Sequence, residues 1–406
     1  MMIILIMIIK RPAETIAINK GNWLLIYGRR KTGKTFIVEN FIKYDEFFFI
    51  KRDRLIIEKK EWKDYNYDTL KELLRRDLSL GKTVVIDEFH RLGEDFLDFL
   101  HAIPQKGKLI LISSTLHLSK KLIGTSSPLL GKFGEVNIGL IDLRDVLRAM
   151  KIKQKGKKDT LEKAVLLREP LVVNLIGDGD LADVILKLKF TSPALLGEVF
   201  TEEDRKLSGI YEGIIRAISI GKATSGEICS FLFSKKLIKK DDPSIIQQYF
   251  TNLVYFGILG RISIWNKNRN VYKHISPILR IFYYLDEKYN FAERDISKRE
   301  LQSYLDEIIP KIMEDSLRDL LGQILGMKIF IYEASDLELD GIYSKFKKPK
   351  VALEVKWEKN IRNEDIKKAE ANLGRIRVPR KVLFVPDKKG LQSDDIEIMD
   401  IDDILT

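Results

Sequence analysis

The chain has 406 residues, 45% of them hydrophobic, which is enough for two to three domains with buried cores and excludes wholesale disorder. A single cysteine, Cys229, excludes a disulfide framework and a thiolate zinc cluster, and the 4 histidines show no metal-ligand spacing. The 70 Lys and Arg outnumber the 59 Asp and Glu, and the resulting charge of +11 suits a polyanionic partner such as nucleic acid or an acidic membrane surface.

The first nine residues are almost wholly apolar and are followed at once by Lys10-Arg11-Pro12. This run is shorter than the roughly 20 residues that a spanning helix needs, and its charges follow the apolar part, the reverse of a signal peptide. We expect a strand or helix packed on the first domain, with a peripheral membrane or partner-binding tail as the alternative. No later segment is long and apolar enough to cross a bilayer. The expectation is therefore a cytoplasmic protein without integral membrane association.

A phosphate-binding loop follows the first predicted buried strand, Trp23–Tyr27. The residues are Gly28-Arg29-Arg30-Lys31-Thr32-Gly33-Lys34-Thr35, which match GxxxxGK[ST] without a mismatch. In such a loop backbone N–H groups surround the phosphates, the lysine reaches the β- and γ-phosphates, and the hydroxyl binds Mg²⁺. Residues 36–43 are predicted as the following helix, whose N-terminus favours an anion. Residues 28–36, ending at Phe36, are therefore expected to bind ATP, with Lys34 in a catalytic role.

An acidic pair follows the predicted strand at residues 83–86. Asp87 is the expected Mg²⁺ acid together with Thr35, and Glu88 is placed to polarise the attacking water. Adjacent Asp and Glu at this position are typical of ATPases with an additional strand in the sheet. A plain surface strand end is the alternative interpretation.

Further strands are predicted at residues 47–50, 109–112 and 136–141, giving a parallel sheet between helices with the ligand at its carboxyl edge. Ser113, Ser114 and Thr115 close the strand at 109–112. A polar side chain there could sense the γ-phosphate, and strand-end capping is an equally open interpretation.

The loop at 28–35, the segment 84–89 and the segment 126–132 together resemble archaeal P-loop ATPases related to AAA+ and STAND proteins. This resemblance implies a P-loop NTPase core in residues 1–141 and a small helical lid in residues 142–204, which include the basic stretch 151–158. It also implies action as a homo-oligomer. Lys132 stands where the family usually has Arg and is a third candidate sensor with Ser113 and Ser114.

Residues 205–290 are predicted to form a winged helix-turn-helix. Three short helices are expected, the second capped by Thr224 with Glu227 in its first turn, followed by a hairpin at residues 261–275. Helical spacing places Ile245, Phe250, Leu253 and Val254 in the core. Gln247 and Gln248 on the opposite face, with Lys267 and Arg269 at the wing tip, are candidate DNA contacts. A wing used for protein docking is the alternative.

Residues 291–406 are predicted to form an α-β-β-β-α-β domain whose first helix spans 310–325. Asp340 followed by Glu354-x-Lys356 resembles the PD-(D/E)XK nuclease superfamily, which has a restriction-endonuclease-like α/β fold. Asp340 and Glu354 would hold Mg²⁺ or Mn²⁺, and Lys356 would orient a water or offset developing charge. Glu314 is an outer candidate acid. An exposed strand face that happens to carry Glu and Lys is the alternative.

Two functional hypotheses follow for this α/β protein. In the first, ATP turnover is coupled to DNA binding or to metal-dependent DNA cleavage. In the second, the chain is a STAND-like switch ATPase whose C-terminal domains bind DNA or a protein partner without cutting. A third, non-enzymatic interpretation is a plain transcription regulator, against which measured ATP hydrolysis would argue.

Overall fold

The computed structural model describes residues 7–115, 127, 129–150, 156–173, 175, 180–203 and 205–405. The chain forms two compact units: an N-terminal unit of Lys10–Ile141 and Leu195–Lys206, and a C-terminal unit of Asp142–Ala194, Leu207–Thr406 and the described residues before Lys10. Three sequence features lie partly outside the described residues, namely the apolar run up to residue 6, positions 126 and 128 of the segment 126–132, and residues 151–155 of the basic stretch.

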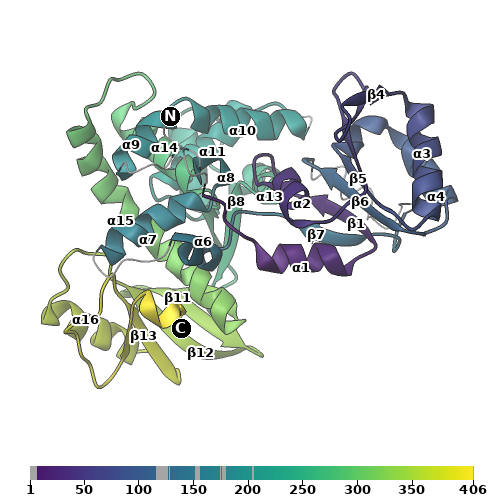
Figure 1. Ribbon diagram of the computed structural model, residues 1–406. Coiled ribbons are helices and arrows are strands. Elements are labelled where there is room, and N and C mark those ends of the chain that lie inside the picture. The colour runs from purple at the N-terminus through teal and green to yellow at the C-terminus, as the bar shows by residue number, and fades with distance from the viewer. Residues whose placement is uncertain are drawn as a thin grey trace. The chain divides into compact units, whose positions relative to one another are not determined.

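A seven-stranded sheet in the order β4-β3-β2-β5-β6-β1-β7 forms the centre of the N-terminal unit (Figure 1). The strands β2, β5, β6, β1 and β7 are parallel neighbours, whereas β3 and β4 continue the edge in antiparallel pairs. The sheet is therefore mixed and not parallel as predicted, because short turns connect β2, β3 and β4 and leave no room for a crossover. The strands are β1 Trp23–Tyr27, β2 Glu46–Ile50, β3 Ile56–Glu58, β4 Lys63–Tyr65, β5 Thr83–Asp87, β6 Lys108–Ser113 and β7 Gly134–Asn137.

Helices cover both faces of this sheet because its central strands are apolar on both sides. In β1, Leu24 and Ile26 point into one core and Trp23 and Leu25 into the other. The first core includes residues of α1 (Pro12–Lys20) and α2 (Lys34–Phe41). The second includes residues of α3 (Tyr67–Ser79), the 3₁₀ turn η1 (Phe89–Leu92) and α4 (Glu94–Ala102). The strands that carry the acidic pair and the loop are thus fixed between two layers of helices.

The C-terminal unit is mainly helical up to residue 255. The helix α12 begins as predicted, since Thr224 and Glu227 form a reciprocal capping box. The helix α10 runs from one unit into the other, because the unit boundary falls at Leu195. The helices are α6 Leu143–Met150, α7 Lys157–Leu167, α8 Pro170–Val173, α9 Leu181–Lys187, α10 Thr191–Glu202, α11 Gly209–Ser219, α12 Ser225–Ser234, η2 Pro243–Ile246, α13 Gln247–Tyr255, α14 Pro277–Tyr289, α15 Lys298–Leu325, α16 Asn363–Gly374 and α17 Asp402–Leu405.

Two helix predictions need correction. The helix expected to begin at Pro310 begins at Lys298 and is capped by Ser297. It is 28 residues long, so Pro310 lies in its interior. An interior proline costs about 3 kcal/mol, and burial of Leu301, Leu305 and other apolar residues upstream offsets this. Ile245 is 42% exposed and does not belong to the core, because the 3₁₀ turn η2 precedes α13 and directs Ile246 inward instead.

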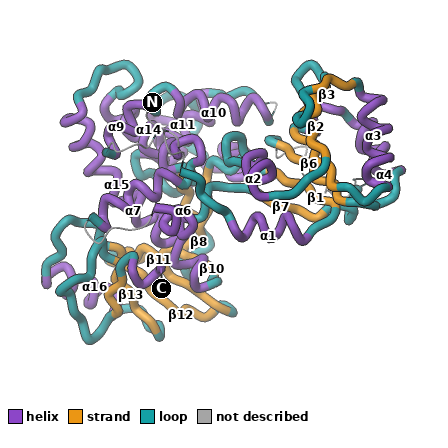
Figure 2. The backbone as a smooth tube through the Cα atoms, in the orientation of Figure 1, coloured by secondary structure: helices purple, strands orange, loops and turns teal. Residues whose placement is uncertain are grey.

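A second seven-stranded sheet, in the order β14-β13-β12-β11-β10-β8-β9, lies in the C-terminal unit (Figure 2). The predicted hairpin β8–β9 is present and antiparallel, and β8 pairs in parallel with β10 at Phe330 and Ile331. The expected boundary at residue 290, between the winged helix-turn-helix and the C-terminal domain, therefore separates β8 and β9 from the other strands of one continuous sheet. The strands are β8 Leu259–Ile264, β9 Asn270–His274, β10 Lys328–Ala334, β11 Leu337–Lys345, β12 Lys348–Val355, β13 Arg380–Phe384 and β14 Glu397–Met399.

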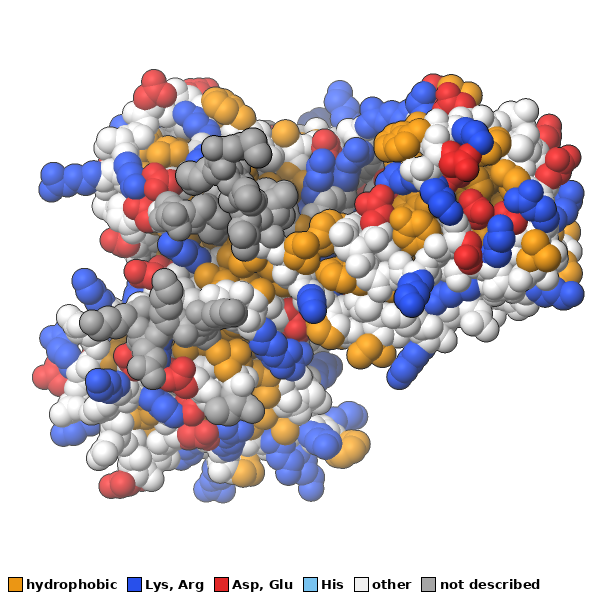
Figure 3. Space-filling view, viewed as in Figure 1, with side chains coloured by type: hydrophobic (Ala, Val, Ile, Leu, Met, Phe, Trp, Pro, Cys, Tyr) orange, Lys and Arg blue, Asp and Glu red, His pale blue; other side chains and the backbone are white. Residues whose placement is uncertain are grey.

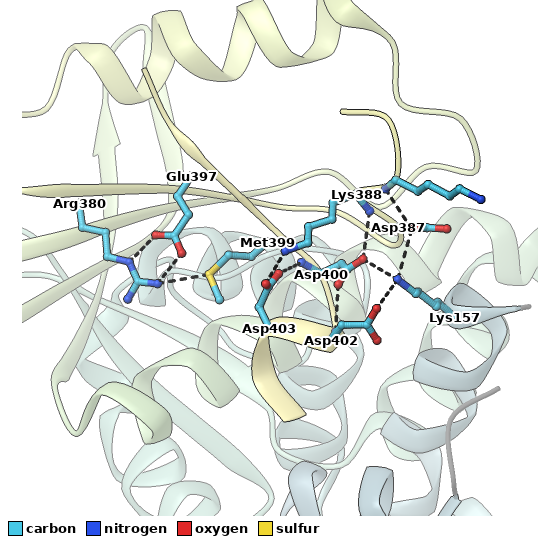
Figure 4. Close-up of polar contacts among 10 residues, drawn as sticks. Lys157, Arg380, Asp387, Lys388, Glu397, Met399, Asp400, Asp402 and Asp403 are labelled. Carbon is cyan, nitrogen blue, oxygen red and sulfur yellow. Dashed lines mark hydrogen bonds and ion pairs between the residues drawn. The ribbon is translucent and has the colours of Figure 1, made fainter. Parts of the chain in front are cut away.

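The helix α7 is tied to the C-terminal end of this sheet by ion pairs (Figure 4). Lys157 Nζ lies 2.8 Å from Asp400 Oδ2 and 2.7 Å from Asp402 Oδ2. One turn further along α7, Glu162 Oε1 accepts a hydrogen bond of 2.8 Å from Trp357 Nε1, two residues beyond β12. Within the residues that the structure describes, no helix combines the length and apolar character needed to cross a membrane.

Candidate functional site

The loop between β1 and α2 has the backbone of a phosphate cradle. Its glycines take conformations that other residues rarely adopt, with φ values of 154° at Gly28 and 87° at Gly33, and Lys31 is also left-handed at 64°. A Cβ at Gly28 would lie 2.1 Å from the carbonyl oxygen of Ile138. These turns bring successive N–H groups to the N-terminus of α2, where an anion is favoured.

Lys34 lies folded over this loop. Its Nζ donates to the carbonyl oxygens of Gly28, at 2.8 Å, and Arg29, at 3.0 Å. These two hydrogen bonds hold the ammonium group against the loop whose N–H groups would face the phosphates. Thr32 steadies the same turn, since its hydroxyl donates to the Arg29 carbonyl oxygen at 2.9 Å.

The two halves of the predicted metal site meet directly. Thr35 Oγ1 donates to Asp87 Oδ2 at 2.7 Å, although 52 positions separate the two residues. β6 lies between β1 and β5, which is the arrangement of the additional-strand class. Burial raises the pKa of Asp87 to about 6, with the hydrogen bond from Thr35 acting in the opposite direction. A hydroxyl and a buried carboxylate at hydrogen-bond distance are hard oxygen donors that fit Mg²⁺.

Glu88, the residue after Asp87, has a left-handed backbone conformation (φ 57°), and its carboxylate lies among several polar side chains. Ser114 Oγ donates to its Oε2 at 2.9 Å, and His90 Nε2 and Arg91 lie 3.4 and 3.6 Å from the same oxygen. Ser113 instead contacts His90 Nδ1 at 3.3 Å and Thr115 Oγ1 at 3.1 Å. Of the two candidate sensor serines, Ser114 is the one that touches the candidate base.

Lys132, the third candidate sensor, has a different set of contacts. Its Nζ donates to the carbonyl oxygens of His101, at 2.5 Å, and Leu100, at 3.4 Å, at the C-terminal end of α4. A lysine at this place satisfies the last carbonyl groups of a helix and complements its dipole. These contacts assign Lys132 to capping α4.

The structure adds two contacts that the sequence did not indicate. Arg11 is buried, with 3% of its surface exposed, and its NH1 donates to the Thr32 carbonyl oxygen at 2.9 Å. Its NH2 also reaches the carbonyl oxygens of Gly139 and Leu140, so it joins the loop to the segment after β7. Arg30 Nε lies 3.3 Å from Glu198 Oε2 of α10, in the part of that helix that belongs to the N-terminal unit.

Comparison with known proteins agrees with this geometry. Residues 20–147 match the family AAA_14, described as an AAA domain. An uncharacterised protein of Methanocaldococcus jannaschii, MJECL04, is 24% identical over 428 aligned positions, covering 90% of each chain. The Walker-type ATPase PABY2304 of Pyrococcus abyssi is similar in structure, with a TM-score of 0.50 and 20% identity over 68% of this chain and 96% of that one.

The N-terminal unit therefore contains a domain similar to AAA-type P-loop ATPases, called the ATPase domain below. A lower likeness, with a TM-score of 0.40 and 13% identity, is found to the ORC2 protein of Aeropyrum pernix in its ADPNP and ADP complexes, over 75% of this chain and 95% of that one. The matched residues of the ATPase domain contain the loop, Asp87, Glu88 and the two serines, so the motif and the family agree on the same site.

A second group of carboxylates lies in the C-terminal unit, outside the ATPase domain. Asp340 sits where the pairing of β10 and β11 shifts register, so that Asp340 and Gly341 both lie opposite Ile331. Bulges of this kind redirect a side chain and are common beside active sites. Asp340 Oδ2 accepts a hydrogen bond of 2.8 Å from the Val355 N–H, which fixes it next to the end of β12.

The acids of this group influence one another. Burial raises the pKa of Asp340, and the charge of Glu354 raises it further. Burial also raises the pKa of Glu354 and of Glu314, and Asp340 acts on Glu314 in the same direction. Lys356 Nζ lies 3.8 Å from Glu354 Oε1, and Asn372 of α16 donates to the same carboxylate at 3.3 Å. The structure thus brings together the residues predicted for the C-terminal site.

Among the described residues, no three His, Cys, Asp or Glu side chains are arranged to hold a metal ion on their own. Mg²⁺ needs fewer protein ligands, since it binds through one or two carboxylates and keeps water or substrate phosphate oxygens as its remaining ligands. Asp340 and Glu354 supply that number of oxygen donors.

The candidate DNA contacts lie on the surface as expected. Gln247 and Gln248 are exposed at the start of α13, where their amides donate to the Pro243 carbonyl oxygen and to Asn252 Oδ1, both at 3.0 Å. Lys267 and Arg269 are exposed in the turn of the β8–β9 hairpin.

Proposed function

We propose that the protein binds and hydrolyses ATP in its ATPase domain and couples this turnover to nucleic-acid binding or cleavage by the C-terminal unit. The hydrogen bond between Thr35 and Asp87 is the main support for ATP binding and hydrolysis, because it joins the end of the phosphate-binding loop to the strand that leads into the acidic pair. Thr35 and Asp87 would hold Mg²⁺, which neutralises the phosphate charge when bound.

The roles of the chain's own residues follow from their contacts. The loop N–H groups bind and orient the phosphates, and Lys34 leaves its carbonyl partners to reach the β- and γ-phosphates. Glu88 takes the proton from the attacking water, and Ser114 holds its Oε2 in place. Ser114 is thereby positioned to report whether the γ-phosphate is present.

Two substitutions test the ATPase proposal. Lys34→Ala is expected to weaken ATP binding, and Glu88→Gln to preserve binding while lowering turnover by about 10²–10⁴-fold, the usual effect of losing a general base. Glu72→Gln, on the exposed side of α3, is the matched control. Wild-type affinity in Lys34→Ala or wild-type turnover in Glu88→Gln would contradict the proposal.

A second activity, metal-dependent cleavage of a phosphodiester, is proposed for the C-terminal site. Its support is the cluster of Asp340, Glu354 and Lys356, in which burial and neighbouring charge raise the pKa of both acids. A divalent cation would relieve this repulsion and polarise the scissile phosphate. Lys356 is placed to orient the attacking water or to offset the charge that develops on the phosphate.

Nuclease assays on single-stranded, duplex and branched DNA with Mg²⁺ or Mn²⁺ test this activity. Asp340→Asn is expected to reduce cleavage by at least about 10²-fold, whereas Asp306→Asn on the exposed face of α15 is expected to cleave normally. If the wild type hydrolyses ATP but leaves every DNA intact, the cleavage proposal fails and the switch ATPase becomes the function.

DNA contact by the winged helix-turn-helix is part of the same proposal. It is supported by the order α11, α12, α13 and the β8–β9 hairpin, and by the exposure of Gln247 and Lys267. Assembly as a homo-oligomer and a cytoplasmic location complete the proposal.

A further inference from the structure

A groove of about 520 Å³ lies at one end of the C-terminal sheet, apart from the carboxylate cluster. Its walls are the turn of the β8–β9 hairpin and the turn between β11 and β12, and its floor is the start of β10. The parallel pairing of β8 with β10, extended by a hydrogen bond of 2.8 Å from Trp265 N–H to the Ile331 carbonyl oxygen, holds these parts together. We call it the aromatic–lysine groove and define it by Trp265, Lys267, Lys328, Phe330, Phe346 and Lys347.

Three aromatic rings line the groove at different depths. Trp265 and Phe330 are half-buried and meet edge to face, with ring centroids 5.0 Å apart, so their orientation is fixed. Phe346 is 88% exposed at the tip of the β11–β12 turn, where it and Lys347 both have left-handed backbone. A large apolar ring held in water by a tight turn gains nothing for the fold and is available to a ligand.

The cations of the groove stand beside these rings. Lys328 Nζ lies 5.0 Å from the centroid of Phe330, and Lys345 Nζ lies 5.9 Å from that of Phe346. Lys267 faces the groove from the hairpin turn and is 3.7 Å from Glu333. Lys348 and Lys350 follow on β12. All residues lining the groove are described, and three of them are lysines whereas none is acidic.

Figure 3 shows the same composition at the surface, with blue Lys and Arg side chains and orange hydrophobic ones side by side at the lower edge of the view, over β12. Lysines that alternate with exposed rings match a chain of phosphates that alternates with flat bases. Bases paired inside a duplex present only their edges, so rings of this kind stack with unpaired bases.

We propose that the aromatic–lysine groove binds single-stranded nucleic acid. Lys267, Lys328 and Lys347 contact the phosphates, and Phe346 and Trp265 stack with bases. This inference deepens the proposed function by naming the state of its nucleic-acid substrate. Phe346 directly follows β11 and lies six positions after Asp340, about 20 Å along a strand, so one bound strand could reach from the groove to the carboxylate cluster.

Binding is tested on the full chain without divalent metal, so that cleavage does not enter the measurement. Fluorescence anisotropy with an end-labelled oligothymidine of about 16 nucleotides is compared with a duplex of equal length and with phosphatidylserine vesicles. Phe346→Ala is expected to weaken single-strand binding by at least about fivefold. Phe190→Ala is the matched control, because Phe190 is 77% exposed in the same unit and also has a lysine, Lys189, near its ring, at 5.6 Å.

The expected result is preference for the single strand over the duplex, with loss of binding in Phe346→Ala and in Lys347→Glu. Binding should stay at the wild-type level in Phe190→Ala and in Lys389→Glu, which changes an exposed lysine in the loop after β13. Equal loss in the Phe190 control, tighter binding of the duplex, or binding to vesicles that depends on Phe346 would overturn the inference. Its failure is distinguishable from failure of the cleavage proposal, since Asp340→Asn, which is expected to lose cleavage, should still bind the single strand in the absence of divalent metal.

Discussion

At the scale of single residues, Gly28 is the position where the phosphate-binding loop leaves no room for a side chain. Its φ is 154°, and a Cβ would lie 2.1 Å from the Ile138 carbonyl oxygen. Gly28→Ala should therefore distort the loop, lower the free energy of unfolding by about 1–3 kcal/mol and abolish ATP binding. Titration with a fluorescent ATP analogue and chemical denaturation measure the two effects.

Gly139→Ala is the control for this substitution. Gly139 lies next to Ile138, and a Cβ built there meets nothing within 4 Å. This variant should bind ATP like the wild type. Unchanged ATP affinity in Gly28→Ala would show that the loop does not have the geometry described.

His274 on β9 is a buried histidine whose charge state affects stability. Its Nε2 lies 2.9 Å from the Ile215 carbonyl oxygen, and burial lowers its pKa from 6.5 to about 3. Between these two values the unfolded chain binds a proton that the folded chain does not. The free energy of unfolding should thus fall as the pH drops below about 6.5, with His274 contributing a slope that approaches ~1.4 kcal/mol per pH unit.

His274→Gln tests this, because its amide can still donate to the carbonyl oxygen but does not titrate. Denaturation at about pH 7 and pH 4.5 should show a flatter dependence in this variant than in the wild type. His101→Gln, at an exposed position on α4, should keep the wild-type slope. A wild-type slope in His274→Gln would mean that other groups cause the acid sensitivity.

The residues of the ATPase site differ in how far the sequence could identify them. Lys34, Thr35 and Asp87 stand in local motifs whose spacing follows from the chemistry of phosphate binding. Arg11 stands in no motif: its partners Thr32 and Gly139 are 21 and 128 positions away, so only the folded chain brings them together. Likewise, Ser114 and not Ser113 contacts Glu88, and this difference depends on side-chain directions that the prediction of a strand does not supply.

At the scale of elements, the start of α13 shows how one short 3₁₀ turn decides which of two neighbouring residues enters the core. Because η2 has the tighter 3₁₀ geometry, Ile246 is fully buried and Ile245 is exposed. Ile246→Ala should lower the free energy of unfolding by about 2–5 kcal/mol, and Ile245→Ala should change it by less than about 0.5 kcal/mol. Chemical denaturation of the two neighbours compares them directly, and equal effects would contradict the assigned turn.

The order of helices and strands was largely predictable, because it depends on local periodicity and caps. The α-β-β-β-α-β order around Asp340 and the hairpin before residue 275 are both present. Pairing between distant strands was not predictable: β3 and β4 extend the first sheet antiparallel, and β8 joins β10 although 67 positions separate Ser263 from its partner Phe330. Register between such strands is set by tertiary packing, to which a single sequence gives no direct guide.

At the scale of the whole molecule, the basic excess is divided among separate sites. Part of it serves the phosphate cradle through Lys34, and part lies at the aromatic–lysine groove through Lys267 and Lys347. Another part is neutralised inside the C-terminal unit, where Lys157 is surrounded by Asp387, Asp400 and Asp402. The net charge of +11 therefore does not describe one continuous basic face.

The ion pairs of Lys157 join segments that lie more than 200 positions apart (Figure 4). Asp400 is fully buried and also accepts backbone N–H groups from Lys388 and Asp402, and these contacts lower its pKa despite the effect of burial. Lys157→Met leaves this carboxylate without its cation and should lower the free energy of unfolding by about 3 kcal/mol at neutral pH. Hydrogen exchange should rise in α7 and β14.

The pair of Arg380 with Glu397 provides the control for this last prediction, because both side chains are more than one third exposed although Arg380 Nε lies 2.6 Å from Glu397 Oε2. Arg380→Met should cost less than about 1 kcal/mol. Asp400 has a lowered pKa in the fold, so its contribution is present above about pH 4 and disappears as the pH falls through that lowered value. The difference in the free energy of unfolding between wild type and Lys157→Met should shrink as the pH falls through this interval. If the difference persists unchanged in acid, Lys157 stabilises the fold through packing of its aliphatic chain and not through its charge.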